Sequence, residues 1–89
     1  MKITDYCDAV KQNLVLIRFN TSKVWIVSIK HSDIKNKKED SCANYINGVG
    51  RNPDEAIMDY VKKIRGKVLV ITNTAKEKQM YSIPDDLTT

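Results

Sequence analysis

The feature that most restricts the fold of this chain is a helix whose two ends are both marked in the sequence. Asn52 is a favoured N-cap residue, Pro53 suits the first helical position, and Glu55 completes an Asn-x-x-Glu capping box. Gly66 supplies the C-terminal stop. Between them the apolar residues fall on one helical face, namely Ala56, Ile57, Tyr60, Val61 and Ile64. We therefore predict an amphipathic helix over residues 53–65, which needs an apolar surface to cover.

The segments around this helix are rich in β-branched and aromatic residues, which favours strands. Trp25, Val27 and Ile29 would share one face of a strand, and Val24, Ile26 and Ser28 the other. The predicted strands are a hairpin of 14–19 and 23–30, a third strand at 42–46, a fourth at 67–72 and a fifth at 79–83.

The remaining segments read as one short helix and several connections. Residues from about Thr4 to Gln12 are expected to form a helix capped by Thr4, and Asn13 would close it. Residues 31–41 are polar, with Ile34 as the single buried candidate, and predict a long, mobile hairpin loop. Turns are expected at 20–22 and 73–77, and Gly48 and Gly50 suit positions of positive φ.

This order of elements, α-β-β-β-α-β with one further strand, predicts an α+β two-layer sandwich. Its antiparallel sheet would be covered on one face by both helices, leaving the opposite face open. Trp25 or Tyr45 could lie on that open face, and the alternative is that both aromatic rings point at the helices. A chain of 89 residues has room for one domain, here residues 1–84, followed by a frayed polar tail at 85–89.

Composition narrows the class of protein. Hydrophobic residues make up 42% of the chain and charged residues 29%, as in an ordinary globular domain. No apolar run approaches the roughly 18–20 residues that span a bilayer, and an acid already at Asp5 argues against a secretory leader. Two cysteines cannot form a disulfide framework. We expect a cytoplasmic protein with no membrane association.

The net charge of +4 permits contact with nucleic acid without requiring it. One cationic cluster contains Lys30, His31, Lys35, Lys37 and Lys38. A second, around the end of the 53–65 helix, contains Lys62, Lys63, Arg65 and Lys67, where cations complement the helix dipole. Solvated surface charge is the favoured interpretation of both clusters, and contact with a ligand is the alternative.

The sequence offers no recognisable catalytic constellation. His31 is the only histidine, and a loop among lysines is a poor place for a general base. Cys7 and Cys42 are isolated and predict buried small hydrophobes. The acids at the start of the 53–65 helix are explained by capping and the helix dipole. We expect no enzymatic activity, no metal and no cofactor.

The segment from Gly48 to Ile57 resembles the glycine turn and following helix of HicB-like antitoxins, and the order α-β-β-β-α resembles the double-stranded RNA-binding domain. The whole chain is also similar in style to small accessory proteins of phages and prophages. Two departures matter. Asp54 and Glu55 stand where RNA-binding domains carry basic residues, and little chain follows the sandwich to form the DNA-binding segment that HicB antitoxins usually add.

These observations predict a non-catalytic, phage-type accessory protein that binds a host or phage protein in the cytoplasm of a bacterium. A homodimer through a strand edge is a further mode of association. The alternative function is nucleic-acid binding through the basic 30–38 loop and Arg51. The candidate binding residues are Lys30, His31, Lys35, Lys37, Lys38, Arg51, Trp25 and Tyr45.

Overall fold

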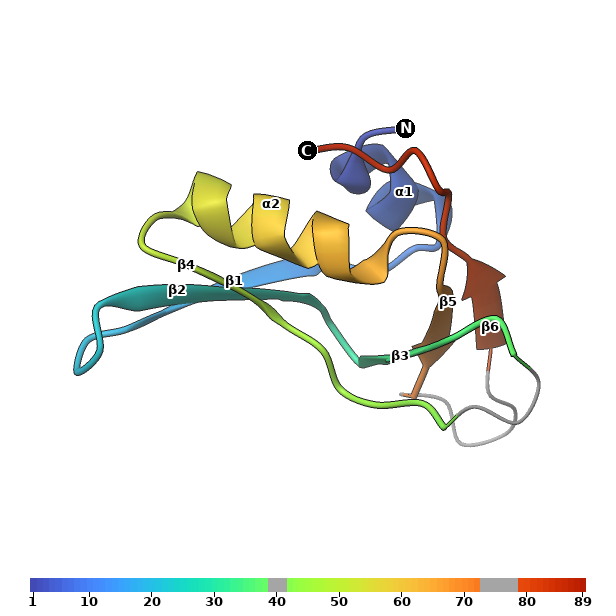
Figure 1. The fold of residues 1–89 in the computed structure, drawn as a ribbon, viewed down its shortest axis with the longest axis horizontal. Coiled ribbons are helices and arrows are strands. Elements are labelled where there is room, and N and C mark those ends of the chain that lie inside the picture. Colours follow the sequence, from blue (N-terminus) through green and yellow to red (C-terminus); the bar gives the residue numbers. More distant parts are fainter. Residues whose placement is uncertain (39–41, 73–78) are drawn as a thin grey trace.

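The computed structural model describes residues 1–38, 42–72 and 79–89 (Figure 1). The predicted turn at 73–77 lies outside these residues, as does the end of the predicted 31–41 loop. The elements in chain order are α1 (Ile3–Ala9), β1 (Leu14–Phe19), β2 (Val24–Ile29), β3 (Ser32–Lys35), β4 (Gly48–Gly50), α2 (Pro53–Ile64), β5 (Val68–Ile71) and β6 (Gln79–Ser82).

The strands form two three-stranded antiparallel sheets, ordered β1-β2-β4 and β3-β5-β6. The α+β class is confirmed, but the strands do not share the single sheet that the sequence suggested. The division occurs between β2 and β3, where His31 adopts the left-handed conformation with φ of 57°. That residue turns the chain, so β3 pairs with β5 instead of extending the first sheet.

The prediction of a loop over 31–41 is wrong for its first part, because Ser32–Lys35 form β3. Ser32 and Ile34 point into the core while Asp33 and Lys35 are half-exposed, which is the two-residue period of a strand. Ile34 is 2% exposed, as predicted. The sequence does not show this period because Ser32, one of the two inward residues, is polar, which leaves Ile34 as the single apolar position.

The third strand is also displaced from its predicted position. Residues 42–46 contribute only an isolated bridge from Asn44 to Ile34, and the strand is β4, Gly48–Gly50. The expected positive φ at Gly48 and Gly50 is wrong, since Gly66 is the glycine with positive φ. A Cβ on Gly48 would lie 2.5 Å from the Tyr60 Cβ, so glycine is needed because β4 lies directly against α2.

Helix α2 forms as its caps predict. The Asn52 side-chain oxygen accepts a hydrogen bond from the Glu55 backbone N–H at 2.9 Å, and the Glu55 carboxylate accepts one from the Arg51 N–H at 2.9 Å. Helix α1 is shorter than predicted, ending at Ala9. The predicted cap, Thr4, is wrong because this residue lies inside the helix, and no side chain caps the start; instead the Ile3 N–H donates to the carbonyl of Thr88 at 2.8 Å.

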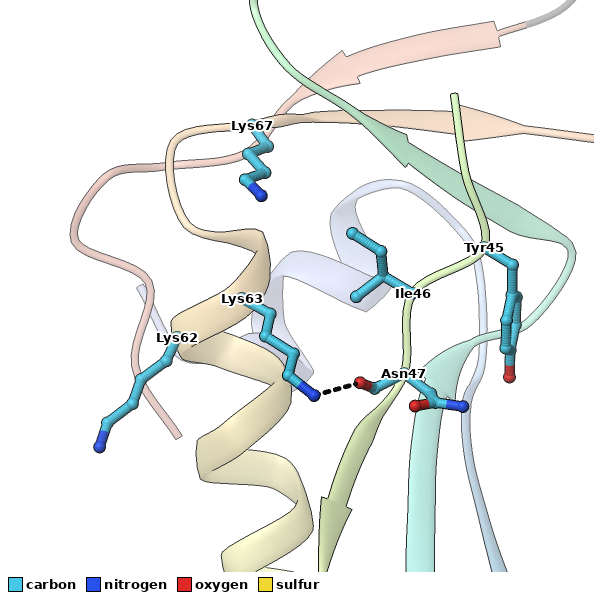
Figure 2. A pocket seen from close by; sticks show the side chains of 6 residues that line it. All are labelled: Tyr45, Ile46, Asn47, Lys62, Lys63 and Lys67. Carbon is cyan, nitrogen blue, oxygen red and sulfur yellow. Dashed lines mark hydrogen bonds between the residues drawn. The ribbon is translucent and has the colours of Figure 1, made fainter. Parts of the chain in front are cut away.

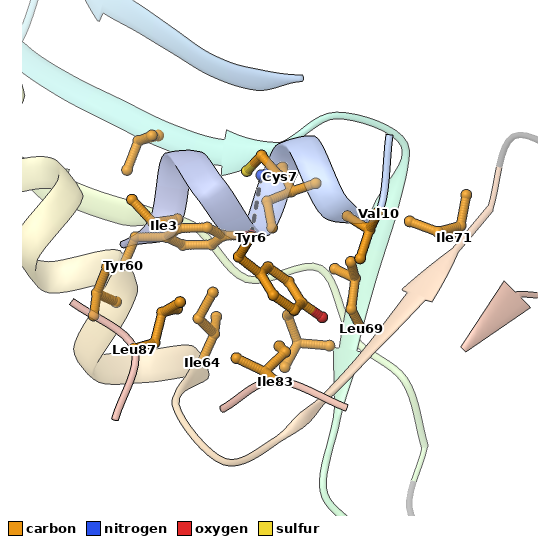
Figure 3. Packing of buried hydrophobic residues seen from close by; sticks show 14 of the residues in the cluster. Ile3, Tyr6, Cys7, Val10, Tyr60, Ile64, Leu69, Ile71, Ile83 and Leu87 are labelled. Carbon is orange, nitrogen blue, oxygen red and sulfur yellow. Dashed lines mark hydrogen bonds between the residues drawn. The ribbon is translucent and has the colours of Figure 1, made fainter. Parts of the chain in front are cut away.

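The core lies where both helices meet the two sheets (Figure 3). Ile3 and Cys7 of α1 pack with Tyr60 and Ile64 of α2, and strand β5 contributes Leu69 and Ile71 (Figure 3). The expectation of a frayed C-terminal segment at residues 85–89 is wrong. Leu87 is completely buried in this cluster, and the Thr88 N–H donates to the carbonyl of Met1 at 2.9 Å.

Candidate protein-binding face

The β1-β2-β4 sheet has one face covered by α2 and one face turned away from it (Figure 1). Side chains alternate between these faces along each strand. Val27 and Trp25 lie on the covered side, opposite Gly48 and Gly50 in the register. The other side, which we name the outer face, consists of Val15, Ile17, Phe19, Val24, Ile26, Ser28 and Val49.

The outer face is apolar and accessible. Ile17 is 52% exposed, Phe19 45% and Val49 41%. Ile17, Ile26 and Val49 lie in one row across the three strands, because Ile26 pairs with both of the others. Six of the seven outer-face residues are hydrophobic, and contiguous exposed apolar surface of this kind marks interaction sites in folded proteins.

Tyr45 extends this surface. Its side chain is 60% exposed, and its hydroxyl lies 3.3 Å from the Ser28 Oγ on the outer face. Trp25, the other predicted aromatic candidate, is half-buried on the covered side and packs against the core. Tyr45 therefore lies on the open face of the sheet, whereas Trp25 lies on the face that the helix covers.

Strand β1 forms one edge of this sheet, since among the described residues it pairs with β2 alone. The Lys30 N–H donates to the Asn13 carbonyl at 2.9 Å, so the odd-numbered residues of β1 direct their backbone groups to β2. The N–H and C=O groups of Leu14, Leu16 and Arg18 consequently point away from the sheet. The register runs without a bulge from Leu14 to Phe19.

The predicted basic residues do not all gather into one site, because Arg51 lies apart from those around β3. Lys30, His31 and Lys38 are exposed around β3, Lys35 is half-exposed, and Lys37 is paired with Asp85 at 3.7 Å. Arg51 lies just before the N-terminus of α2, whereas Lys67 follows its C-terminus. Lys35 lies beyond the C-terminus of α2, since it pairs with Val68 of β5. The twelve residues of α2 span about 18 Å, so Arg51 does not share a compact site with the cations around β3.

A basic hollow of about 490 Å³ lies beside the C-terminal half of α2 (Figure 2). Lys62, Lys63 and Lys67 line it together with Tyr45, Ile46 and Asn47. The Tyr45 ring points away from the lysines, on the other side of the 45–47 segment, and the Lys63 ammonium is already bonded to the Asn47 carbonyl at 3.1 Å (Figure 2). The hollow therefore offers few convergent groups for a ligand.

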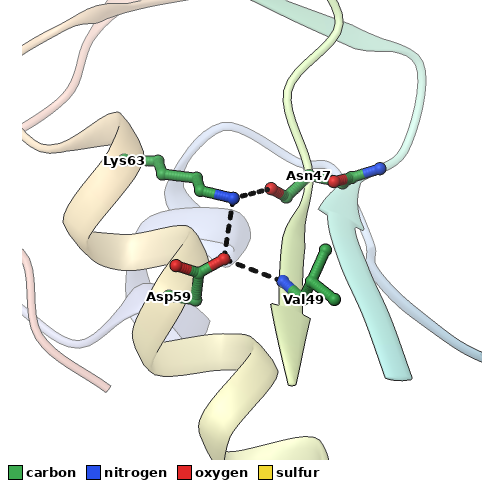
Figure 4. Close-up of polar contacts among 4 residues, drawn as sticks. All are labelled: Asn47, Val49, Asp59 and Lys63. Atoms are coloured by element: carbon green, nitrogen blue, oxygen red, sulfur yellow. Dashed lines mark hydrogen bonds and ion pairs between the residues drawn. The ribbon is translucent and has the colours of Figure 1, made fainter. Parts of the chain in front are cut away.

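Lys63 has a structural role that the charge pattern alone did not reveal. Its ammonium is 2.8 Å from the Asp59 carboxylate, which also accepts a hydrogen bond from the Val49 N–H at 2.9 Å (Figure 4). The hydrogen bond from Lys63, followed by the one from Val49, lowers the pKa of Asp59. These contacts attach β4 to α2. The four-residue spacing of Asp59 and Lys63 was the available signal.

The cysteines differ from each other. Cys7 is buried as predicted, and burial, followed by the charge of Asp8, raises the pKa of its thiol from 9.0 to about 11. The thiol is therefore protonated at neutral pH and a poor nucleophile. Cys42 is exposed, contrary to the prediction. The described part of the chain holds no group of three or more His, Cys, Asp or Glu residues arranged to bind a metal.

No helix in the described ranges has the length and apolarity needed to cross a membrane. Comparison with protein-family models, curated proteins and solved structures finds no match for this chain. The resemblances to HicB-like antitoxins and to RNA-binding domains stay predictions.

Proposed function

We propose that this chain is a non-catalytic protein-binding module and that the outer face is its contact surface. The observation that supports this most is the exposure of Ile17, Phe19 and Val49, each above 40%. A domain of this size has few apolar residues to spare, so an uncovered row of them on a regular sheet favours a use outside the molecule.

The site chemistry favours protein over the other classes of partner. A largely apolar face without carboxylates or imidazoles offers no general base, and the buried Cys7 thiol is protonated at neutral pH. Nucleic acid is less favoured because Arg51, before the start of α2, lies apart from the other proposed cations around β3, of which Lys37 is already paired with Asp85. A role as a phage-type accessory protein in the bacterial cytoplasm is part of this proposal.

The test is capture of partners from bacterial lysate by immobilised protein, with an outer-face variant beside a matched control. Ile17→Ser removes a 52% exposed apolar residue from the outer face, and Met80→Ser removes a 57% exposed one from β6. We expect a stoichiometric partner that the Ile17→Ser variant loses and the Met80→Ser variant keeps. Equal recovery by both variants, or no stoichiometric partner in replicate experiments, would contradict the proposal.

A further inference from the structure

We infer that β1, the strand at the edge of the outer face, receives an extended apolar segment of a partner protein with acidic flanks, which adds to the sheet as a further strand. This inference rests on the proposed function and specifies the chemistry of the partner. Two independent features of the hairpin formed by β1 and β2 support it: its free backbone edge and its charge.

In the part of the chain that the structure describes, no strand pairs with the outer edge of β1, and this strand is exposed on both faces of the sheet. Ile17 is 52% exposed on the outer face and Leu16 is 36% exposed on the opposite face. Leu14, Leu16 and Arg18 direct their backbone groups outward. Natural edge strands are usually protected by proline, bulges or several charges. The six residues of β1 have one charge, Arg18, and neither of the other devices.

The charged residues in and beside the hairpin are all cationic. From Ala9 to Ser32 the sequence contains no Asp or Glu, but it contains Lys11, Arg18, Lys23 and Lys30, all four exposed. These four charges equal the net charge of the whole chain, since the remaining 11 basic residues balance the 11 acidic ones. The electrostatic field of the hairpin therefore attracts acidic residues flanking an apolar strand.

A second copy of this chain is a poorer occupant. Two hairpins side by side would bring eight cations together with no acid between Ala9 and Ser32 of either copy. The sheet under the outer face has six residues on each of β1 and β2 and three on β4, which cover roughly 250 Å² by ordinary strand spacing, against about 800 Å² per partner in a stable interface. An added strand does not need so large an area, because backbone hydrogen bonds along the edge of β1 supply part of its binding.

Nucleic acid is a poorer occupant for a different reason. The free edge presents alternating donors and acceptors at Leu14, Leu16 and Arg18. Phosphate oxygens can accept hydrogen bonds from the N–H groups but offer no donors for the C=O groups. A peptide backbone supplies both, which is the basis of recognition by strand addition.

The experiment is selection of random peptides displayed on phage against the full chain, followed by fluorescence anisotropy with the most enriched peptide. We expect enriched sequences with apolar residues at alternate positions and Asp or Glu at the flanks, and affinity that falls as salt is raised. No enrichment, enrichment of basic sequences, or a helical apolar period would overturn the inference. So would tighter binding to a single-stranded oligonucleotide or to anionic vesicles than to every selected peptide.

Two pairs of variants test the edge and the charge separately. Leu16→Pro removes an outward N–H, whereas the Leu16→Thr control keeps it; we expect the proline variant alone to lose about tenfold in affinity. Reversal of Arg18 and Lys23 to Glu should also weaken binding about tenfold, and Lys62→Glu, outside the hairpin, should not. Circular dichroism establishes that each variant is folded, and the charge variants decide the matter if the proline variant is not.

The outcomes separate this inference from the proposed function. Loss of peptide binding in Ile17→Ser but not in Leu16→Pro or the charge-reversed variant would retain the outer face as the contact surface and overturn strand addition. Binding of peptide and lysate partner that is unaffected by Ile17→Ser would overturn both.

Discussion

The hydroxyl oxygen of Tyr60 accepts a hydrogen bond from the backbone N–H of Ile29 at 3.0 Å, although 31 residues separate the two. Strand β4 pairs with β2 only between Trp25 and Val27, so Ile29 has no strand partner on that side. Its carbonyl accepts from the Ser32 Oγ at 2.6 Å. Side chains thus satisfy both backbone groups at the point where the first sheet ends and the second begins.

Tyr60→Phe should leave the buried Ile29 N–H without its partner. We expect a loss of about 1–3 kcal/mol in the free energy of unfolding, the usual cost of an unsatisfied buried donor. Urea denaturation measures it. Tyr45→Phe is the control, because its hydroxyl bond to Ser28 is exposed and its removal should have little effect. Equal stability of the Tyr60→Phe variant and the parent would show that the bond contributes nothing.

Gly50→Ala should be strongly destabilising. The added methyl would lie 2.6 Å from the Glu55 Cβ and would overlap the Ala56 backbone, so β4 would have to move away from α2. We expect a loss above about 2 kcal/mol, at the upper end for overpacking, or failure to fold. Thermal denaturation provides the measurement. A stable Gly50→Ala variant would contradict the close packing of β4 on α2.

The C-terminal segment should contribute to stability through one residue. Leu87 is fully buried, whereas Asp86 beside it is exposed. Leu87→Ala should cost about 2–5 kcal/mol, as large-to-small changes in a core do. Asp86→Ala should have no comparable effect in the same denaturation experiment. If both variants match the parent, the segment does not pack as described.

Stability should decline in alkaline solution. Burial is the main cause that raises the pKa of Cys7 from 9.0 to about 11 and the pKa values of Tyr6 and Tyr60 from 10.0 to about 12. The folded state therefore holds these protons more tightly, and its advantage is complete below pH 9 and is lost as the pH rises to 12. Denaturation midpoints measured from pH 7 to 12 should fall above pH 9. A flat profile would contradict the burial of these groups.

The Asp59 carboxylate should stabilise the fold modestly and only when ionised. Asp59→Asn should cost about 0.5–1 kcal/mol at neutral pH, because the ion pair with Lys63 is partly exposed and screened by solvent. The folded-state pKa lies below the ordinary 3.8, so this contribution is present above pH 3.8 and is lost as the pH falls through the lower value. The difference between parent and variant in urea denaturation should therefore shrink in acid.

The features that the sequence predicts correctly are those encoded by neighbouring residues. The caps of α2 need only Asn52, Pro53 and Glu55, and the hairpin of β1 and β2 needs one turn between two apolar runs. Strand β4 could not be predicted from neighbouring residues. Glycine is needed at positions 48 and 50 because Ala56 and Tyr60 of α2 lie against them, and this contact exists only in the folded structure. The place of β4 as a strand follows from tertiary packing and not from propensity.

For the candidate surface too, the sequence predicts local features but not those that depend on tertiary packing. Alternation along β2 predicts that Trp25 and Ile26 lie on opposite faces, but not which face the helices cover. That choice depends on the position of α2, which is set by β4 and by the bonds of Asp59 and Lys63. The basic loop can be identified from the sequence because charged residues are recognised there directly. An exposed row such as Ile17, Ile26 and Val49 can be identified only when the strand register is known.

The pairing of Lys2 with Thr88 has a practical consequence for handling this protein. Both ends of the described chain emerge together beside α1, on the α2 side of the first sheet (Figure 1). A fluorophore, affinity tag or surface linker attached at either end would project from that place and leave β1 unobstructed. A short connector could join the two ends, and new termini could then be opened in the turn at 20–22. The resulting circular permutant would allow the contribution of the hairpin to stability to be measured apart from that of the rest of the fold.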